Sequence, residues 1–333
     1  MITIGQIAEL AGVSKSTVSR VINSSGYVHE DTRNKIESII NKYNYSPSAT
    51  AQNLSRQDSN TIGIVVPELD NTFFSEVLSG VSEVADENNL TMILCNTSNS
   101  AKKEKEALRM MEQQRVKGVI FTPAIGYSDE EAARSIRLQL QNLRVPVVLV
   151  DREIENVQWD GVFYENFQSG YLAAERLIER GNQKIGIITG DMDLKHARER
   201  FRGYQQALED HGLPMDPDYV YEGNYTVERA CAITLKMFQD KKRPQALVLS
   251  NNATTLGFLK GLTESGKSLE QDIQIAAIDH IPALDMIGFR YDCITRDAKG
   301  MGRTAMQLLL ERFKNPDRER KLYMIPCIRK FRT

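Results

Sequence analysis

The sequence predicts two units of different fold class, a small all-α unit at the N-terminus and a larger α/β core of two similar lobes. The first sixty residues hold short helical patterns with polar turns, whereas the rest alternates β-branched runs with longer amphipathic segments. The length of 333 residues exceeds one usual hydrophobic core and favours two or three domains of about 100–150 residues. We therefore place a boundary near residue 60.

Two short helices joined by a tight turn open the N-terminal unit. Thr3 can cap the first helix, residues 11–13 make the turn, and Ser14 can cap the second helix. Val18 and Val21 are spaced to face the first helix, which turns the polar side chains of the second helix outward. These outward side chains are Lys15, Ser16, Ser19 and Arg20.

A third helix completes a small apolar core and is followed by a polar connection. It opens at Glu30 or Asp31 and stops before Pro47. Residues 48–55 form one more short, mostly polar helical stretch, and residues 57–60 have the composition of a linker. A three-helix core of this size fits a binding module. The residues that the third helix should bury are Ile36, Ile39, Ile40 and Tyr43.

The remainder of the chain repeats a strand followed by a helix-length segment. Helices on both faces of a parallel sheet bury such strands, and two sets of runs favour two similar lobes. Ligands of such sheets bind beyond the carboxyl ends of the strands, so the residues after each run are candidates for a site. The runs are Ile62–Val66, Met92–Cys95, Gly118–Phe121, Val147–Val150, Ile185–Ile188, Ala246–Leu249 and Ile273–Ile278.

Polar and aromatic side chains follow four of these runs. They suit a sugar, because carboxylates and amides bind vicinal hydroxyls, arginine donates several hydrogen bonds, and an aromatic ring covers the apolar C–H face. The alternative is that Asp70 or Asn71 merely caps the next helix and that Asp151 and Arg152 form an ordinary loop pair. The recurrence favours a ligand site. The groups are Asp70, Asn71, Phe73 and Phe74 after the first run, Asp151 and Arg152 after the fourth, Asn251 and Asn252 after the sixth, and Asp279 and His280 after the seventh.

One stretch matches a catalytic motif. Residues 261–268 fit the phosphate-loop pattern G-x-x-x-x-G-K-[ST] letter for letter. A phosphate loop leaves a strand and opens a helix, whereas Leu256 and Leu259 here predict the end of a helix, and a strand follows at 273–278. We interpret Gly266 as a helix C-cap, which disfavours a nucleotide hydrolase.

Composition narrows the function classes. The chain is 41% hydrophobic and 26% charged with a mean hydropathy of -0.38, as in globular proteins rather than disordered ones. Its 42 Lys and Arg against 44 Asp and Glu give a net charge of -2, so any contact with nucleic acid must be local. No run approaches the ~18 apolar residues that span a bilayer, and no export signal opens the sequence. We expect a cytoplasmic protein with no membrane partner.

Cysteine and histidine usage predicts neither a metal nor a cofactor. The four cysteines lie far apart without a C-x-x-C pair, and the four histidines show no metal-ligand spacing. No Ser or Cys nucleophile motif accompanies them, so no residue is a catalytic candidate. We interpret His29, His196 and His211 as ordinary loop or surface residues and keep His280 as a candidate ligand contact.

Segments along the whole sequence closely resemble the lactose-repressor/galactose-repressor (LacI/GalR) family of transcriptional regulators. The resemblance is most specific in the N-terminal unit and continues in one order to the C-terminus. Its N-terminal segments are Thr3-Ile4, Ala-Gly-Val-Ser-Lys-Ser-Thr-Val-Ser-Arg-Val-Ile-Asn at 11–23, Tyr-Asn-Tyr-Ser-Pro-Ser-Ala at 43–49 and Ile-Gly-Ile-Val-Val-Pro at 62–67. Its later segments are 71–74, 115–120, 146–152 and 170–174.

The resemblance implies a helix-turn-helix DNA-binding headpiece and a core similar to periplasmic sugar-binding proteins, with three crossovers between its lobes. The implied divisions are the headpiece at 1–46, a hinge helix and linker at 47–59, and the effector-binding core at 60–333. The first lobe would hold about 60–160 and 293–320, and the second lobe about 161–292 and 321–333.

The resemblance also implies which residues contact DNA. Lys15, Ser16 and Arg20 fall at base-reading positions, in agreement with the outward face predicted above. Leu54 falls at the hinge leucine that enters the minor groove, and its short helix should fold only on the operator. The implied DNA contacts are Lys15, Ser16, Thr17, Arg20, Asn23, Tyr27, Ser48 and Leu54.

A second implied set binds the effector. This sequence departs from the family at Asn252, at His280 and at residues 291–296, where Arg296 adds a cation, and these departures bear on the identity of the effector. The implied effector contacts are Asp70, Phe73, Phe74, Thr122, Asp151, Arg152, Arg200, Tyr225, Asn251, Asp279 and Arg296.

We therefore expect a regulator, in the manner of a repressor, of carbohydrate-utilisation genes that catalyses nothing. It should bind a palindromic operator as a homodimer, because a palindrome needs a two-fold partner. The chain ends soon after the expected strand at 322–328, without the C-terminal helix on which the lactose repressor's tetramers depend. A sugar-transport receptor and a phosphate-loop enzyme are the competing classes.

Charge favours a neutral monosaccharide as the effector. The implied contacts include three arginines and three aspartates, which leaves no net charge. Hydroxyls can satisfy both kinds of group when the lobes close, whereas a phosphate would face the aspartates. The alternative effector is a sugar acid or phosphosugar that pairs with Arg296 and Arg200.

Overall fold

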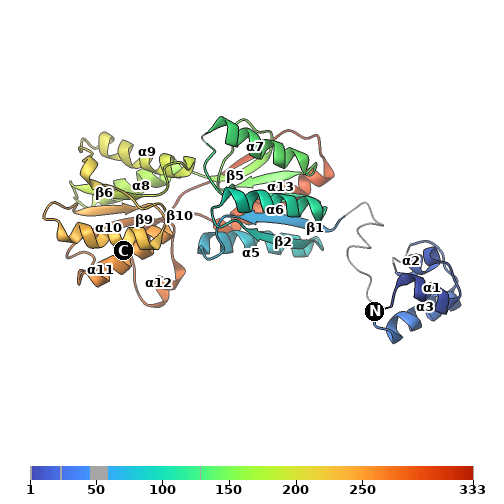
Figure 1. Ribbon diagram of the computed structural model, residues 1–333. Coiled ribbons are helices and arrows are strands. Elements are labelled where there is room, and N and C mark those ends of the chain that lie inside the picture. The colour runs from blue at the N-terminus through green and yellow to red at the C-terminus, as the bar shows by residue number, and fades with distance from the viewer. Residues whose placement is uncertain (1, 23–24, 46–58, 128, 333) are drawn as a thin grey trace. The chain divides into compact units, whose positions relative to one another are not determined.

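The computed structural model of the protein describes residues 2–22, 25–45, 59–127 and 129–332. They form two compact units that divide between Ser59 and Asn60, where the sequence pattern changes (Figure 1). Each unit has its own apolar core.

The N-terminal unit is a three-helix bundle whose first two helices form a helix-turn-helix. Thr3 caps the first helix in a capping box, Gly12 makes the turn at a φ of 70°, and the Ser14 hydroxyl accepts from the Thr17 amide at 3.1 Å. The expectation that Tyr43 is buried was wrong, because its side chain lies where the third helix ends and is 47% exposed. The helices are α1 (Ile4–Ala11), α2 (Lys15–Ile22) and α3 (Glu30–Lys42).

The first lobe of the core is a six-stranded sheet with helices on both faces. Its strand order is β11-β5-β4-β3-β1-β2, and every pairing is parallel. Helices α5 and α13 pack on one face, and α6 and α7 on the other. The elements are β1 (Thr61–Val66), α5 (Thr72–Glu87), β2 (Thr91–Asn96), α6 (Ala101–Gln113), β3 (Val119–Phe121), α7 (Glu130–Asn142), β4 (Val147–Val150), β5 (Asp160–Tyr164), α13 (Ala298–Lys314) and β11 (Leu322–Ile325).

The second lobe repeats this plan. Its strand order is β12-β10-β9-β8-β6-β7, with only the edge strand β12 antiparallel among the described pairings. Helices α8 and α9 cover one face, and α10 and α11 the other. The elements are α8 (Asn166–Glu179), β6 (Ile185–Thr189), α9 (Lys195–Asp210), the 3₁₀ helix η1 (Pro217–Tyr219), β7 (Val220–Glu222), α10 (Val227–Gln239), β8 (Ala246–Leu249), α11 (Asn252–Glu264), β9 (Gln274–Ile278), α12 (Pro282–Met286), β10 (Asp292–Thr295) and β12 (Ile328–Lys330).

The chain crosses between the lobes three times, after β5, after β10 and after β11. Each crossover follows a complete strand, because the strand's hydrogen bonds fix it in one sheet before the chain can leave. The expected lobe limits at 160, 293 and 320 were therefore a few residues early. Residues 322–325 belong to the first lobe, and the expected strand at 322–328 is divided between β11 and β12.

Paired glycines bring one helix pair in each lobe into backbone contact. A Cβ at Gly170 of α8 would lie 1.9 Å from the Arg200 carbonyl oxygen of α9. A Cβ at Gly203 of α9 would likewise lie 1.9 Å from the Phe167 carbonyl oxygen of α8. Gly80 and Gly302 form the equivalent crossing of α5 and α13. The crossing in the second lobe fixes the backbone of α9 at Arg200, a residue of the site described next.

Candidate functional site

Two aspartates occupy equivalent positions at the carboxyl ends of the two sheets. Asp151 directly follows β4, and Asp279 directly follows β9. Their φ angles are 63° and 72°, in the left-handed region that few residues other than glycine adopt. Such strained backbone persists where surrounding structure enforces it and is concentrated at functional sites.

Arg296 joins these two aspartates between the lobes. Its Nη1 lies 2.6 Å from Asp151 Oδ1 and its Nε lies 3.1 Å from Asp279 Oδ1. The guanidinium also stands 3.7 Å from the ring centroid of Phe73 and 4.7 Å from that of Tyr164. Burial is the largest influence and would raise the pKa of Asp151, but the charge of Arg296, together with those of Arg152 and Arg200, outweighs it and lowers that pKa to about 2. Both partners are therefore charged at neutral pH.

Two further arginines are buried beside this cluster and held by neutral acceptors. Arg152 Nη1 donates to Asn99 Oδ1 at 3.0 Å and to the carbonyl oxygens of residues 123 and 124. Arg200 donates to Asn166 Oδ1 at 2.9 Å and to the carbonyl oxygen of residue 250 at 2.6 Å. The Nε of Arg152 is buried with no partner among the described residues, so it remains free to donate to a ligand.

A stacked pair of rings completes the second lobe's wall. His196 and Tyr225 lie with centroids 5.4 Å apart and planes 6° apart; His196 is buried and Tyr225 is half-buried. Burial lowers the pKa of His196 well below its usual value, so the ring is neutral at pH 7. No described residue bonds to the buried Tyr225 hydroxyl. The interpretation of His196 as an ordinary loop or surface residue was wrong, although its spacing of four residues from Arg200 places both on one face of α9.

These groups surround a cavity of about 30 Å³ between the lobes. Nine of the eleven implied effector residues line it, and Glu68, Asn71 and His196 join them. Asp70 is instead exposed in a neighbouring groove, and Thr122 is buried under the site without lining it. The lining residues are Glu68, Asn71, Phe73, Phe74, Asp151, Arg152, His196, Arg200, Tyr225, Asn251, Asp279 and Arg296.

Two of the polar residues also have structural roles. Asn71 caps α5, its Oδ1 accepting from the Phe73 amide at 3.1 Å, and Asn251 caps α11, accepting from the Thr254 amide at 2.8 Å. Asn71 therefore caps α5, as the alternative predicted, and also lines the cavity. His280 does not line the cavity and instead lies 3.0 Å from Asp285.

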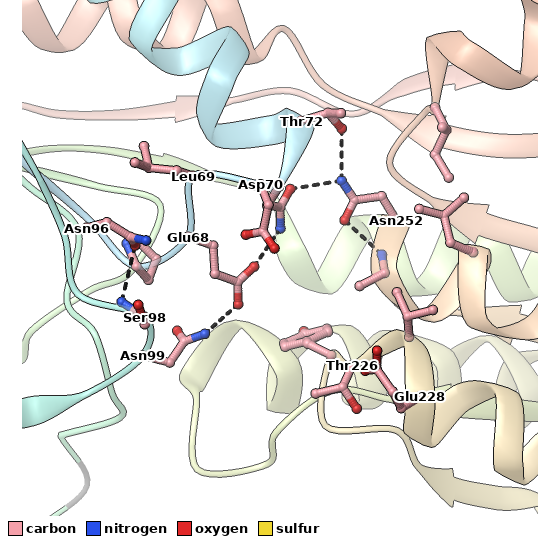
Figure 2. A pocket seen from close by; sticks show the side chains of 17 residues that line it. Glu68, Leu69, Asp70, Thr72, Asn96, Ser98, Asn99, Thr226, Glu228 and Asn252 are labelled. Carbon is pink, nitrogen blue, oxygen red and sulfur yellow. Dashed lines mark hydrogen bonds between the residues drawn. The ribbon is translucent and has the colours of Figure 1, made fainter.

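A groove of about 560 Å³ adjoins the cavity and is lined by residues of both lobes (Figure 2). Asn252 Nδ2 reaches across it, donating to Asn71 Oδ1 at 2.8 Å and to Thr72 Oγ1 at 3.1 Å. At another mouth of the cleft, Lys195 Nζ lies 2.7 Å from Glu153 Oε2. Direct contacts between lobes therefore flank the cavity.

The headpiece presents part of its implied DNA surface. Lys15, Ser16 and Arg20 are exposed on α2, Thr17 is half-buried, and Tyr27 is 86% exposed. Asn23, Ser48 and Leu54 lie outside the described residues, as does the expected hinge helix.

The phosphate-loop match lies in the wrong structural context. It begins inside α11, which ends at Glu264, and Gly266 follows the cap with a φ of 66°. Lys267 pairs with Asp272 at 3.0 Å rather than facing an open loop. The described ranges hold no group of three or more metal-ligating side chains, and none of their helices is long and apolar enough to span a membrane.

Comparison with known proteins covers both units. The model of "Bacterial regulatory proteins, lacI family" matches residues 3–48, and that of "Periplasmic binding proteins and sugar binding domain of LacI family" matches residues 59–327. The repressor PurR of Vibrio atlanticus is 32% identical over 324 residues, covering 97% of this chain and 95% of its own.

Solved structures show the same likeness. The Lac repressor dimer bound to operator and the anti-inducer ONPF is 25% identical with a TM-score of 0.81, covering 99% of this chain and 98% of its own. A LacI-family regulator from Enterococcus faecium with bound ribose is 25% identical with a TM-score of 0.72, covering 81% and 96%. The chain therefore belongs to the LacI family and is a DNA-binding transcriptional repressor with a periplasmic-binding-protein-like core.

Proposed function

We propose that a neutral monosaccharide binds in the cavity between the lobes and controls the affinity of this repressor for the operator of carbohydrate-utilisation genes. The observation that carries the proposal is the pairing inside the cavity. Arg296 is neutralised by two aspartates, while Arg152 Nε and the Tyr225 hydroxyl are buried and unpartnered among the described residues. Sugar hydroxyls can both accept and donate, so they satisfy these two groups without disturbing the ion pairs.

The charge balance supports a neutral ligand. Three arginines line the cavity with Asp151, Asp279 and Glu68, so 3 − 3 leaves no net charge, with Glu68 in the place expected for Asp70. A phosphate or carboxylate would have to compete with both aspartates for Arg296. Phe73 and Phe74, with ring centroids 4.9 Å apart, offer apolar surface for the C–H face of a sugar. The bound ribose of the Enterococcus faecium regulator is consistent with this chemistry.

The size of the cavity connects binding to lobe movement. A volume of about 30 Å³ accommodates roughly one or two water molecules, far less than a sugar ring. Entry of an effector therefore requires the lobes to separate, which breaks flanking contacts such as Asn252–Asn71 and Lys195–Glu153. A ligand that binds the separated arrangement shifts the population toward it, as allosteric control requires.

Purine bases are the second candidate class, because curated relatives carry the name PurR and the His196–Tyr225 stack offers an aromatic face. Thermal-shift screening of the full chain against pentoses, hexoses, sugar acids, phosphosugars and purine bases separates the classes, since a ligand of the folded state raises its stability. We expect only neutral sugars to raise the melting temperature. Stabilisation by purine bases or by anionic sugars alone would refute the neutral-sugar proposal.

For DNA we propose that Arg20 reads a guanine while Lys15, Ser16 and Thr17 tune neighbouring bases, because these residues lie on the N-terminal part and outer face of α2. Arg20→Ala should cost about 1–3 kcal/mol per half-site on the preferred operator and flatten the preference at one base pair. Lys35→Ala, which removes an exposed cation from α3, is the control. An equal loss on all sequences would assign Arg20 to the phosphate backbone instead.

We also propose a homodimer on a palindromic operator, supported by the likeness to the Lac repressor dimer on its operator. Light scattering of the full chain with and without operator DNA measures the assembly. A tetramer at all concentrations, or a monomer on DNA, would contradict it.

A further inference from the structure

We propose that Gly126 positions the two walls of the site, because only a residue without a side chain lets the lobes close onto a cavity of about 30 Å³. Gly126 lies in the loop between β3 and α7 of the first lobe. A Cβ there would lie 2.1 Å from the carbonyl oxygen of Asp193, which precedes α9 of the second lobe. Among the glycines of the described ranges, no other would meet the opposite lobe in this way. The inference goes beyond the proposed function, because it concerns lobe closure without a ligand.

The backbone conformation of Gly126 does not itself require glycine. Its φ lies outside the left-handed region, unlike those of Gly12 and Gly266. Alanine can therefore adopt the same backbone, and the close approach of Asp193 is what excludes a side chain. Separation of the lobes removes that neighbour, so a substitution at Gly126 acts on the closed arrangement alone.

The first lobe holds the loop of Gly126 in place and ties it to the site. Glu104 of α6 is buried, and its carboxylate accepts from the Ala124 amide at 2.5 Å and from the Tyr127 hydroxyl. Arg152 of the cavity wall donates to the Ala124 carbonyl oxygen at 2.8 Å. These bonds resist displacement of the loop, and a displacement would also move Arg152.

The second lobe holds the opposing carbonyl in place as well. Arg198 Nη1 donates to the carbonyl oxygens of Met192 and Asp193 at 2.9 and 2.8 Å. The Asp193 amide donates to Asp191 Oδ1 at 2.9 Å. His196 of the other cavity wall follows in the first turn of α9. The contact is therefore a steric limit, since no rotation of a side chain can relieve an overlap with this carbonyl.

This limit determines how small the closed cavity becomes. One wall carries Arg152, which is bonded to the loop of Gly126, and the other carries His196, close in sequence to Asp193. A side chain at position 126 would hold these walls apart. It would thus favour the separated arrangement through which, in the proposed function, a ligand enters.

Zero-length cross-linking of the full chain without ligand measures closure. A carbodiimide joins Lys195 of the second lobe to Glu153 of the first while their charged groups are in contact, at 2.7 Å in the closed arrangement. The crossing of α8 and α9 holds Lys195 in its own lobe, so this interlobe product reports the approach of the lobes. The reference product joins Lys321 to Glu311 within the first lobe, also 2.7 Å apart and similarly exposed. Peptide mass spectrometry quantifies both products.

Gly126→Ala should lower the interlobe product at least about fivefold against the reference product, because overpacking a rigid contact shifts a two-state population that far. Asp193→Ala keeps the carbonyl and is the matched control, so it should leave the interlobe product unchanged. Adding Arg198→Ala to Gly126→Ala frees the carbonyl and should restore most of the product. The circular dichroism spectrum of Gly126→Ala should match that of the wild type, because both lobes stay folded.

A wild-type yield of the interlobe product from Gly126→Ala would overturn the proposal. An equal loss from Asp193→Ala would also overturn it, since the side chain rather than the carbonyl would then make the contact. Failure of Arg198→Ala to restore any product, or a parallel loss of the reference product, would assign the effect of Gly126→Ala to general damage and refute the steric limit. None of these outcomes depends on which effector binds, so the proposed function stands or fails separately.

Discussion

Four buried aspartates lie at opposite ends of the two sheets, and their arginine partners differ in whether they lie within one lobe or between the two. At the amino ends, Asp160 opens β5 and Asp292 opens β10. At the carboxyl ends, Asp151 follows β4 and Asp279 follows β9. Each pair occupies equivalent places in the two lobes.

The amino-end aspartates are bound entirely within one lobe. Asp160 accepts three bonds from Arg312 and two from Arg318, at 2.9–3.1 Å, and one from the Lys321 amide. Asp292 similarly lies between Arg176 at 2.8 Å and Arg180 at 3.4 Å. No cavity adjoins these clusters among those described.

The carboxyl-end aspartates share one arginine across the lobes and lie in strained backbone beside unpartnered groups. The contrast teaches that buried ion pairs have two uses in one fold. A saturated cluster inside one lobe stabilises that lobe, whereas a cluster divided between lobes makes their separation depend on what else enters the site.

The largest expected effect on stability follows from substituting Asp160 at the amino end of β5. Asp160→Asn removes the carboxylate that binds both Arg312 and Arg318, which leaves Arg318 with only the more distant Glu311 at 3.6 Å, and should lower the free energy of unfolding by about 3–5 kcal/mol. Urea unfolding of the full chain followed by circular dichroism measures it, with exposed Asp317→Asn as control. Sugar affinity should not change. A change under about 1 kcal/mol would break the comparison, because the cluster would then not stabilise the lobe.

A smaller, pH-dependent effect on stability is expected for Asp151, at the carboxyl end of β4. The pKa of Asp151 is about 2 in the folded protein against an ordinary 3.8, so its charge stabilises the folded state by about 2 kcal/mol above pH 4. Protonation removes this as pH falls toward 2, and about half should remain at pH 3.

Asp151→Asn should therefore cost about 2 kcal/mol at pH 6 and about half of that at pH 3. The difference between urea unfolding curves of the two proteins isolates this group from other titrations. A cost that stayed constant from pH 6 to pH 3 would show that the charge of Asp151 is not what Arg296 stabilises.

The smallest effects are expected for two tyrosines of the second lobe, one at the amino end of its sheet and one in the site. They extend the comparison from charged to uncharged groups. Tyr204 donates to the Ile185 carbonyl oxygen at 2.7 Å at the amino end of β6, whereas the Tyr225 hydroxyl has no described partner. Tyr225→Phe should leave stability unchanged but weaken sugar binding by about 1 kcal/mol, or about fivefold. Tyr204→Phe should do the reverse, lowering stability by about 1 kcal/mol at constant affinity. Calorimetry and urea unfolding on both variants measure the two quantities, and equal behaviour would contradict the proposed division.

Runs of apolar residues predicted most of the strands, but they did not predict β5 and β10, which begin with aspartates bound by arginines distant in the sequence. The runs at 62–66, 147–150 and 246–249 are apolar throughout and became β1, β4 and β8. β5 and β10 begin with aspartates that can be buried only because arginines bind them, in β5 from more than 150 residues away. No window of neighbouring residues contains that information.

The sequence predicted the location of the site better than it predicted which side chains line it. The rule that ligands bind beyond strand ends, together with the family resemblance, located nine lining residues. Which of the polar residues after β1 points inward depends on the turn, because Asn71 caps α5 while Asp70 turns to the groove and Glu68 takes its expected place. His196 was missed because its role comes from stacking on Tyr225, which follows it by 29 residues.

The crossing of α5 and α13 also determines when each lobe can be finished during synthesis. Val77 and Val81 of α5 are buried partly beneath α13, and β5 lacks its outer neighbour until β11 exists. On the ribosome, residues 60–164 therefore emerge with an uncovered apolar face, while residues 166–295 contain nearly all of the second lobe. Apart from its edge strand β12, the second lobe is therefore translated completely before the first lobe is, and a nascent chain released before α13 ends at Lys314 would carry that uncovered face into the cell.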